Sequence, residues 1–104
     1  CASGLGDGEY ELGGTIVYVK DGKALLADGT IAASTTNIFA EFRNIISFGV
    51  PVRQAVKSCT INPARAIGVD DVTGSIAVGK RADFTVLSSD LKELECVYIK
   101  GKRI

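Results

Sequence analysis

The segment NPARAIGVDDVTGSIAVGKRADFTVL, residues 62–87, decides the fold prediction for this chain. Asn62 is a favourable N-cap, because its side-chain oxygen can accept a hydrogen bond from a free amide of the first helical turn. Pro63 suits the first helical position, where a missing N–H group costs nothing. Gly68 stands where a left-handed residue commonly ends a helix. The start of the segment therefore predicts a short helix.

The second half of this segment predicts extended structure. Gly74 and Gly79 bracket residues 75–78, which indicates a short strand between two turns. The apolar run FTVL at residues 84–87 has the composition of a buried strand.

Upstream of this segment, the periodicity of apolar residues predicts two further helices. Ser34 is a candidate N-cap for the first, Gly49 ends it, and Pro51 starts the second. The first helix would carry its apolar residues on one face, at Ile38, Phe39, Phe42, Ile45 and Ile46. The second would do the same at Val52, Ala55, Val56 and Cys59.

Both ends of the chain read as β-structure. The β-branched and aromatic run at residues 15–19 precedes Asp21-Gly22, which is typical of a two-residue hairpin turn. A second turn at Asp28-Gly29 leads into the short run at residues 30–33. Towards the end, residues 94–99 predict a strand that a turn at residues 100–103 reverses.

Composition excludes several classes of function. The 104 residues amount to one domain, and a hydrophobic content of 46% is enough for a core. Twelve basic and twelve acidic residues cancel, so no net charge attracts nucleic acid or an anionic membrane. We find no apolar run of about 18 residues, so no membrane span is expected, and no signal peptide.

The chain has no histidine, the commonest metal ligand and general base. Its three cysteines, Cys1, Cys59 and Cys96, are odd in number and widely spaced, which favours thiols in a reducing cytoplasm. We expect Cys59 and Cys96 to be buried. The glycine-rich start resembles a loop cut from a longer polypeptide, so we interpret the chain as a C-terminal fragment.

The ordered pattern NPA-A-G followed by G-I--G--ADF-V resembles the closing signature of the amidohydrolase superfamily. Residues 8–34, together with Arg43-Asn44 and residues 63–68, are similar to the N-acetylglucosamine-6-phosphate deacetylase family. The resemblance implies an α/β fold, the C-terminal part of a metal-dependent (β/α)8 barrel with a small composite β-sandwich. Four parts are implied: a loop leaving the last barrel strand at 1–8, a β-hairpin region near the barrel mouth at 9–33, the final barrel helices at 34–68, and β-sandwich strands at 69–104.

The resemblance further implies hydrolysis of N-acetylglucosamine-6-phosphate to glucosamine-6-phosphate and acetate, with a divalent metal such as zinc or iron. The metal ligands and the catalytic Asp would lie upstream, so no catalytic or metal-binding residue is assigned to this chain. The fragment alone is expected to be inactive. Its partner would be the upstream barrel of the same polypeptide, and a homodimer is compatible with the family.

One site is implied for this chain by the resemblance. Backbone groups of Ile31, Ala32, Ala33 and Ser34 would contact the bound sugar, although Ala33 stands where the family usually has Gly. An exposed helix start at Ser34 would add free N–H groups. The alternative is that Ser34 only caps its helix.

Other candidates have simpler structural explanations. Asp70-Asp71 fits turn chemistry better than a metal-binding carboxylate pair. Glu9 and Glu11 would share one solvated strand face. Cys59 has no histidine partner for nucleophilic catalysis, and residues 4–8 match a phosphate loop only loosely.

Two other functions remain open from the sequence. The chain could belong to a different amidohydrolase, related to dihydroorotase or hydantoinase. It could also be a non-catalytic structural module. Because its apolar stripes need partners, we expect the chain to fold poorly alone.

Overall fold

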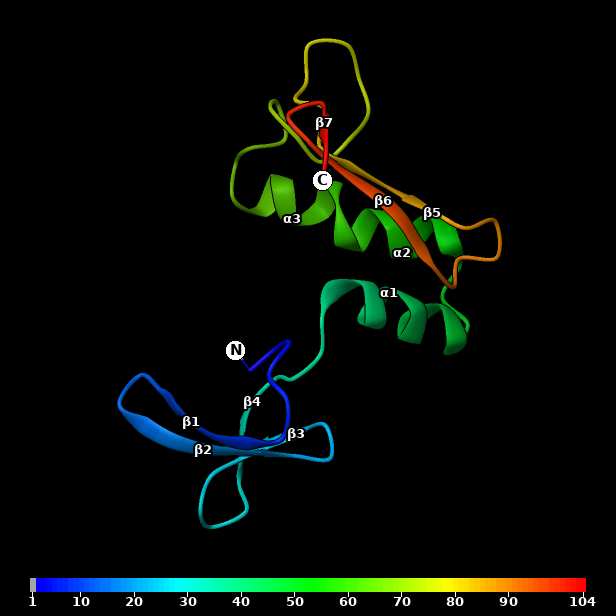
Figure 1. The fold of residues 1–104 in the computed structure, drawn as a ribbon. Coiled ribbons are helices and arrows are strands. Elements are labelled where there is room, and N and C mark those ends of the chain that lie inside the picture. The colour runs from blue at the N-terminus through cyan, green and yellow to red at the C-terminus, as the bar shows by residue number, and fades with distance from the viewer. Residues whose placement is uncertain (1) are drawn as a thin grey trace. The chain divides into compact units, whose positions relative to one another are not determined.

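The computed structural model describes residues 2–104, so Cys1 lies outside it, and it contains two compact units. The first ends at Glu41 and the second spans Phe42–Ile104. Figure 1 shows a sheet in each unit, with the helices between them in the sequence. In residues 2–104, no helix has the length and apolar character needed to cross a membrane. The predicted α/β composition is therefore present as two antiparallel sheets and three helices within this range.

The first sheet has four antiparallel strands in sequence order. These are β1 (Gly8–Leu12), β2 (Thr15–Lys20), β3 (Lys23–Leu25) and β4 (Ile31–Ala33). Each follows its neighbour through a short connection, so all of the pairing is local.

Two type I′ turns fix the register of this sheet. Asp21 and Gly22 both have positive φ, 50° and 71°, between the paired residues Lys20 and Lys23. This confirms the predicted hairpin turn, because type I′ turns require positive φ at both central positions. Gly13-Gly14 makes an equivalent turn between β1 and β2.

Strand alternation builds the core of the first unit. Val17 and Val19 point into it and are almost fully buried, whereas the intervening Tyr18 lies on the other face. Ala2 and Ala24 complete the buried cluster. The sheet thus has one covered face, and its small core is made from short side chains.

Helix α1 spans Ile38–Ser47, and its N-terminus corrects the predicted cap. Asn37 Oδ1 accepts a hydrogen bond from the N–H of Ala40 at 2.9 Å, which is the N-cap to N3 contact. Ser34 lies outside the helix, and its Oγ accepts a hydrogen bond from Thr36 N–H at 3.4 Å. The prediction of Ser34 was wrong. Ser and Asn both favour N-caps, so the residue type alone does not distinguish Ser34 from Asn37. In the structure Ser34 directly follows β4 and the helix begins only at Ile38.

The end of α1 agrees with the prediction. Gly49 has φ of 93° and donates to the carbonyl of Ile46, while Val50 donates to that of Ile45. This pair of hydrogen bonds is the Schellman motif. Helix α2 follows at Val52–Cys59 and begins one residue later than predicted, because Pro51 occupies the capping position and not the first helical position.

Helix α3, Ile61–Ala66, begins two residues earlier than predicted. Thr60 is the residue before it, so Asn62 lies inside the first turn and is not the N-cap. Pro63 is tolerated there because amides of the first turn have no partner within the helix. The predicted end is confirmed: Gly68 has φ of 70°, and Val69 donates to the carbonyl of Ala64.

The strand predicted at residues 75–78 is absent, and bends and turns occupy this segment. Gly74 and Gly79 do have positive φ, 85° and 88°, as turn residues would. The segment reverses on itself instead of pairing with a strand, since the N–H of Lys80 donates to the carbonyl of Ala77. Ile76 and Val78 are consequently almost fully exposed.

The second sheet has the order β5-β6-β7. Its strands are Phe84–Leu87, Leu94–Ile99 and Lys102–Arg103, all antiparallel. Strand β5 was predicted to be buried, but its residues are half-buried or exposed because it forms an edge of a small sheet. The rings of Phe84 and Tyr98 stack across the strands, with centroids 4.6 Å apart.

Asp83 connects the two ends of this sheet. Its Oδ1 accepts a hydrogen bond from Lys100 N–H at 2.7 Å, and its Oδ2 pairs with Arg81. The N–H of Gly101 also donates to the carbonyl of Ala82. The turn between β6 and β7 is therefore attached to the residues that begin β5.

The two described cysteines are half-buried free thiols rather than the buried ones that we expected. Cys59 closes α2, where neighbouring positions are exposed, and Cys96 lies in β6. The second unit, which contains both cysteines, buries too little surface to enclose their side chains.

Candidate substrate-side pocket

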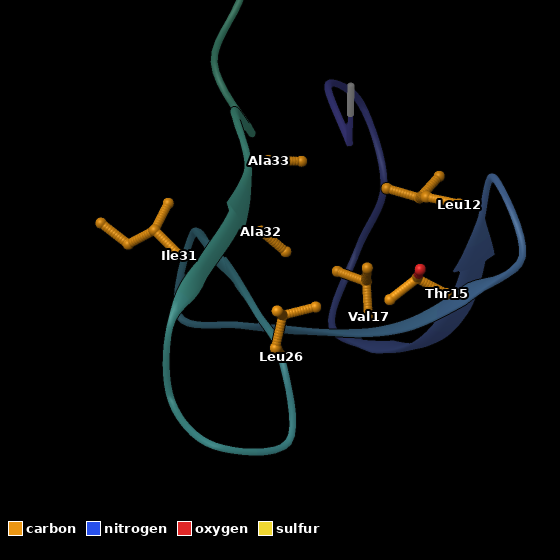
Figure 2. Close-up of a pocket in the computed structure, with 7 residues that line it drawn as sticks. All are labelled: Leu12, Thr15, Val17, Leu26, Ile31, Ala32 and Ala33. Atoms are coloured by element: carbon orange, nitrogen blue, oxygen red, sulfur yellow. The ribbon is translucent and has the colours of Figure 1, made fainter.

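A pocket of about 330 Å³ opens on the covered face of the first sheet. Figure 2 shows the side chains that line it. They come from β1, β2, β4 and the residue that follows β3: Leu12, Thr15, Val17, Leu26, Ile31, Ala32 and Ala33. Three of the four residues predicted to lie beside a substrate, Ile31, Ala32 and Ala33, are therefore brought together at one wall.

The strands place these side chains by alternation and turn geometry. Val17 is buried at the base, and Leu12 and Thr15 flank the Gly13-Gly14 turn on the opposite side from β4. In Figure 2 the side chains of Ala32 and Ala33 point towards that side, whereas Ile31 points away. Ile31 is 78% exposed, so its contribution to the wall comes from the chain near its backbone.

An irregularity in β4 shapes this wall. Ala33 pairs with Ala24 and Ile31 pairs with Leu25, so Ala32 has no partner of its own on β3. Such a bulge inserts one extra residue, bends the strand and redirects its groups. This explains why two consecutive alanines can both face the pocket in a strand whose side chains would otherwise alternate.

The residues on either side of β4 are held by hydrogen bonds. Before the strand, Leu26 N–H donates to the carbonyl of Thr30 at 2.8 Å, and Thr30 N–H donates to Asp28 Oδ1 at 2.9 Å. After the strand, Ala2 N–H donates to the carbonyl of Ser34 at 2.8 Å. The hydrogen bond from the Thr30 backbone, followed by that from its side chain, lowers the pKa of Asp28. Asp28 is thus an ionised turn residue.

The side chains that line the pocket can contact a ligand, but none of them is a reactive group. Thr15 supplies its one side-chain hydroxyl among the lining residues, and the remaining side chains are aliphatic. No group of three or more His, Cys, Asp or Glu residues within residues 2–104 could hold a metal ion. The described residues therefore do not fit a metal centre.

The fourth predicted residue, Ser34, does not line the pocket. Its carbonyl is engaged by Ala2, and its hydroxyl supports a local turn. The helix start that we expected beside the pocket lies at Asn37 instead. Any contact of this region with a substrate would therefore involve β4 and not a helix N-terminus.

The other candidate residues have structural roles, as predicted. Asp70 lies in a turn, where its carboxylate is 3.6 Å from Arg65 Nε and its carbonyl accepts from Lys80 Nζ. Glu9 and Glu11 are exposed on the same face of edge strand β1.

The opposite wall of the pocket was not predicted from the sequence. It is formed by Leu12, Thr15, Val17 and Leu26. The alternation of residues 15–19 could have placed Val17 on the inner face. No sequence signal marks the bulge at Ala32, because it arises from the pairing of β3 with β4.

Comparison with known proteins relates this geometry to a family. The model for the family described as "Amidohydrolase family" matches residues 13–104. An N-acetylgalactosamine-6-phosphate deacetylase of Escherichia coli O157:H7 is 37% identical over 102 residues, which cover 97% of this chain and 27% of the relative. An N-acetylglucosamine-6-phosphate deacetylase of Bacillus subtilis is 40% identical over 90 residues, which cover 86% and 23%.

A solved structure gives the same relationship. The N-acetylglucosamine-6-phosphate deacetylase of Pasteurella multocida superposes with a TM-score of 0.90 at 31% identity, over 99% of this chain and 27% of that one. The chain thus spans about a quarter of the length of these three proteins. With a family model matched over most of its length, the chain belongs to the amidohydrolase family.

Proposed function

We propose that this chain is the C-terminal part of an N-acetylglucosamine-6-phosphate deacetylase, which hydrolyses the acetamide to give glucosamine-6-phosphate and acetate. The similarity to named deacetylases runs along nearly the whole chain, in sequence and in structure. This similarity is the observation that carries the proposal, and the bulged β4 supplies one wall of a pocket lined by aliphatic side chains and Thr15. Such a wall suits binding of a substrate whose chemistry occurs on other residues.

In this proposal the chain contributes contacts and not reactive groups. The backbone of β4, residues 31–33, lies along one side of the sugar, and the aliphatic side chains beneath β4 exclude water from that side. The divalent metal expected for the family, and the Asp that would act as general base, belong to polypeptide outside these 104 residues. The family resemblance implies this division, and the lack of histidine in the chain is compatible with it.

The similarity to deacetylases also supports a proposal about the fold of the longer polypeptide. Residues 34–68 would be the final helices of a (β/α)8 barrel, and residues 69–104 would supply strands to a small β-sandwich. The three-stranded second sheet, with half-buried and exposed apolar residues on its strands, suits a sheet that is completed by other strands. Homodimerisation and a cytoplasmic location remain predictions.

A substrate screen on the longer polypeptide tests the proposed activity. We expect acetate release from N-acetylglucosamine-6-phosphate, and loss of that release when divalent metal is removed with a chelator. N-acetylgalactosamine-6-phosphate is the second candidate substrate, because the relative from Escherichia coli O157:H7 carries that name. Turnover of dihydroorotate or a hydantoin, with neither sugar phosphate cleaved, would overturn the proposal.

A pocket variant tests the role of β4. Ala32→Leu adds bulk to the wall without changing charge, and we expect a higher KM for the sugar phosphate because the cavity is reduced. Ala77→Leu is the matched control, since Ala77 is exposed in the other unit. Equal KM values for the two variants would exclude β4 as a substrate contact.

A further inference from the structure

The segment that follows β4 is attached to the first sheet at two consecutive residues. Ala2 N–H donates to the carbonyl of Ser34 at 2.8 Å, and the Thr35 hydroxyl donates to the carbonyl of Gly22. Ala2 is fully buried in the core of this unit. Gly22 belongs to the type I′ turn between β2 and β3, whose geometry is fixed by two positive φ angles. The attachments therefore connect the exit of β4 to the buried core of the unit and to the turn between β2 and β3.

These two hydrogen bonds lie next to β4, a strand that makes few regular hydrogen bonds of its own. The strand is three residues long, lies at the edge of the sheet and contains the bulge at Ala32. A bulge interrupts the regular ladder of hydrogen bonds, so the ladder alone does not determine the path of the strand. The position of Ala33 in the pocket wall then depends on where the chain is fastened next, at Ser34 and Thr35.

Thr35 is the side-chain member of this pair. The Ser34 attachment uses backbone atoms only, whereas the Thr35 attachment depends on a hydroxyl that a substitution can remove. Thr35 is not among the residues that line the pocket. Its effect on the pocket would be exerted through the backbone of residues 31–34.

We propose that Thr35 is a positioning residue for substrate binding: its hydrogen bond to the Gly22 carbonyl holds the bulged β4 in the conformation that forms the pocket wall. The inference rests on the proposed deacetylase function, because it assigns a role within that same site. The Asp21-Gly22 turn, which directly precedes β3 and lies at the end of the sheet where β4 exits, then holds β4 in place as well as connecting β2 and β3.

The test compares three variants in the longer, metal-loaded polypeptide. Thr35→Val removes the hydroxyl and keeps the shape, and Thr35→Ser keeps the hydroxyl. Thr60→Val is the matched control, since the Thr60 hydroxyl also donates to a backbone carbonyl, that of Val56, but in the other unit. We measure KM and kcat for N-acetylglucosamine-6-phosphate, and amide hydrogen exchange in residues 31–35.

We expect Thr35→Val to raise KM by about three- to tenfold, the range set by loss of one hydrogen bond, with a much smaller change in kcat. Exchange in residues 31–35 should become faster. Thr35→Ser should restore both values, and Thr60→Val should change neither. A wild-type polypeptide without activity on either sugar phosphate would refute the proposed function. An active wild type whose KM or β4 exchange is unaffected by Thr35→Val would refute the positioning role alone.

Discussion

Gly74 illustrates how a single backbone position can constrain a whole loop. Its φ of 85° is strained for any residue with a Cβ atom, and a Cβ built there would lie 2.7 Å from the Ala64 Cβ and 3.2 Å from the Ile61 Cα. Helix α3 and the loop therefore approach each other through a position that only glycine fills. Gly79, with φ of 88°, has the same backbone conformation but open space around it.

Substitutions at these two glycines distinguish the cost of the left-handed backbone conformation from the cost of steric overlap. We expect Gly74→Ala to lower the free energy of unfolding by about 2–4 kcal/mol, from the left-handed conformation and the overpacking together. Gly79→Ala should cost about 1–2 kcal/mol, since it has the conformational cost alone. Denaturant unfolding of the longer polypeptide measures both. Equal losses would mean that α3 moves away from the added methyl group without penalty.

Asp83 gives the second sheet a dependence on pH. The Lys100 N–H, and after it the Arg81 side chain, lower the pKa of Asp83 below its ordinary value of 3.8. Because the folded pKa is the lower one, the carboxylate stabilises the fold above about pH 4, and this contribution is lost as pH falls through the folded pKa. We expect Asp83→Asn to lower the melting temperature at pH 7 and to reduce its decline at acid pH.

The control for Asp83 is Asp71→Asn, which removes an exposed carboxylate from a turn in the same unit. In this variant the melting temperature should decline at acid pH as it does in the wild type. If the decline is also unchanged in Asp83→Asn, the contact with Lys100 makes no difference to stability.

At the scale of elements, two polar residues before α1, Ser34 and Asn37, are candidates for its N-cap. The structure caps the helix with Asn37, whereas the sequence pattern favoured Ser34. We expect Asn37→Ala to destabilise the longer polypeptide by about 1 kcal/mol, the usual cost of losing a side-chain cap, and Ser34→Ala to cost distinctly less. The reverse order, measured by denaturant unfolding, would place the helix start at Ser34.

Elements that are specified by local chemistry were predicted well. The Asp21-Gly22 turn, the glycine helix ends at Gly49 and Gly68, and the strand at residues 94–99 all occur as expected. Each depends on residues within one turn or one strand, so the sequence contains the whole signal.

Elements that depend on a partner were predicted badly. Residues 75–78 have the composition of a strand, but they find no strand to pair with and remain in bends. The helix start at Asn62 failed because α2 and α3 are separated by Thr60 alone, which leaves no room for a separate capping segment. The family resemblance indicated residues 31–34 as substrate contacts, and residues 31–33 of these line the pocket. The opposite wall and the bulge were not predicted, because they depend on strand pairing.

At the scale of the whole molecule, the amount of buried surface is small. The buried apolar residues of the described chain are mostly alanine and valine, with Phe42 as the one large side chain among them. Large apolar residues are instead exposed in the second unit, including Phe48, Ile67, Ile76 and Val78. Exposed apolar surface on this scale indicates a face that a further part of a protein covers.

The isolated 104-residue chain is therefore expected to be unstable. We predict a broad thermal transition, binding of a hydrophobic dye and no acetate release from N-acetylglucosamine-6-phosphate. The longer polypeptide should show a sharp transition and little dye binding under the same conditions. A sharp, reversible transition of the dilute monomeric chain would contradict this expectation.

The two-residue turns have a consequence for the order of folding. Gly13-Gly14, Asp21-Gly22 and Lys100-Gly101 each join strands that are adjacent in the chain, so forming either sheet closes only short loops. Hairpins of this kind assemble within about 1–10 μs. We infer that both sheets form early during refolding, and that docking of these hairpins onto the remaining chain is a slower step.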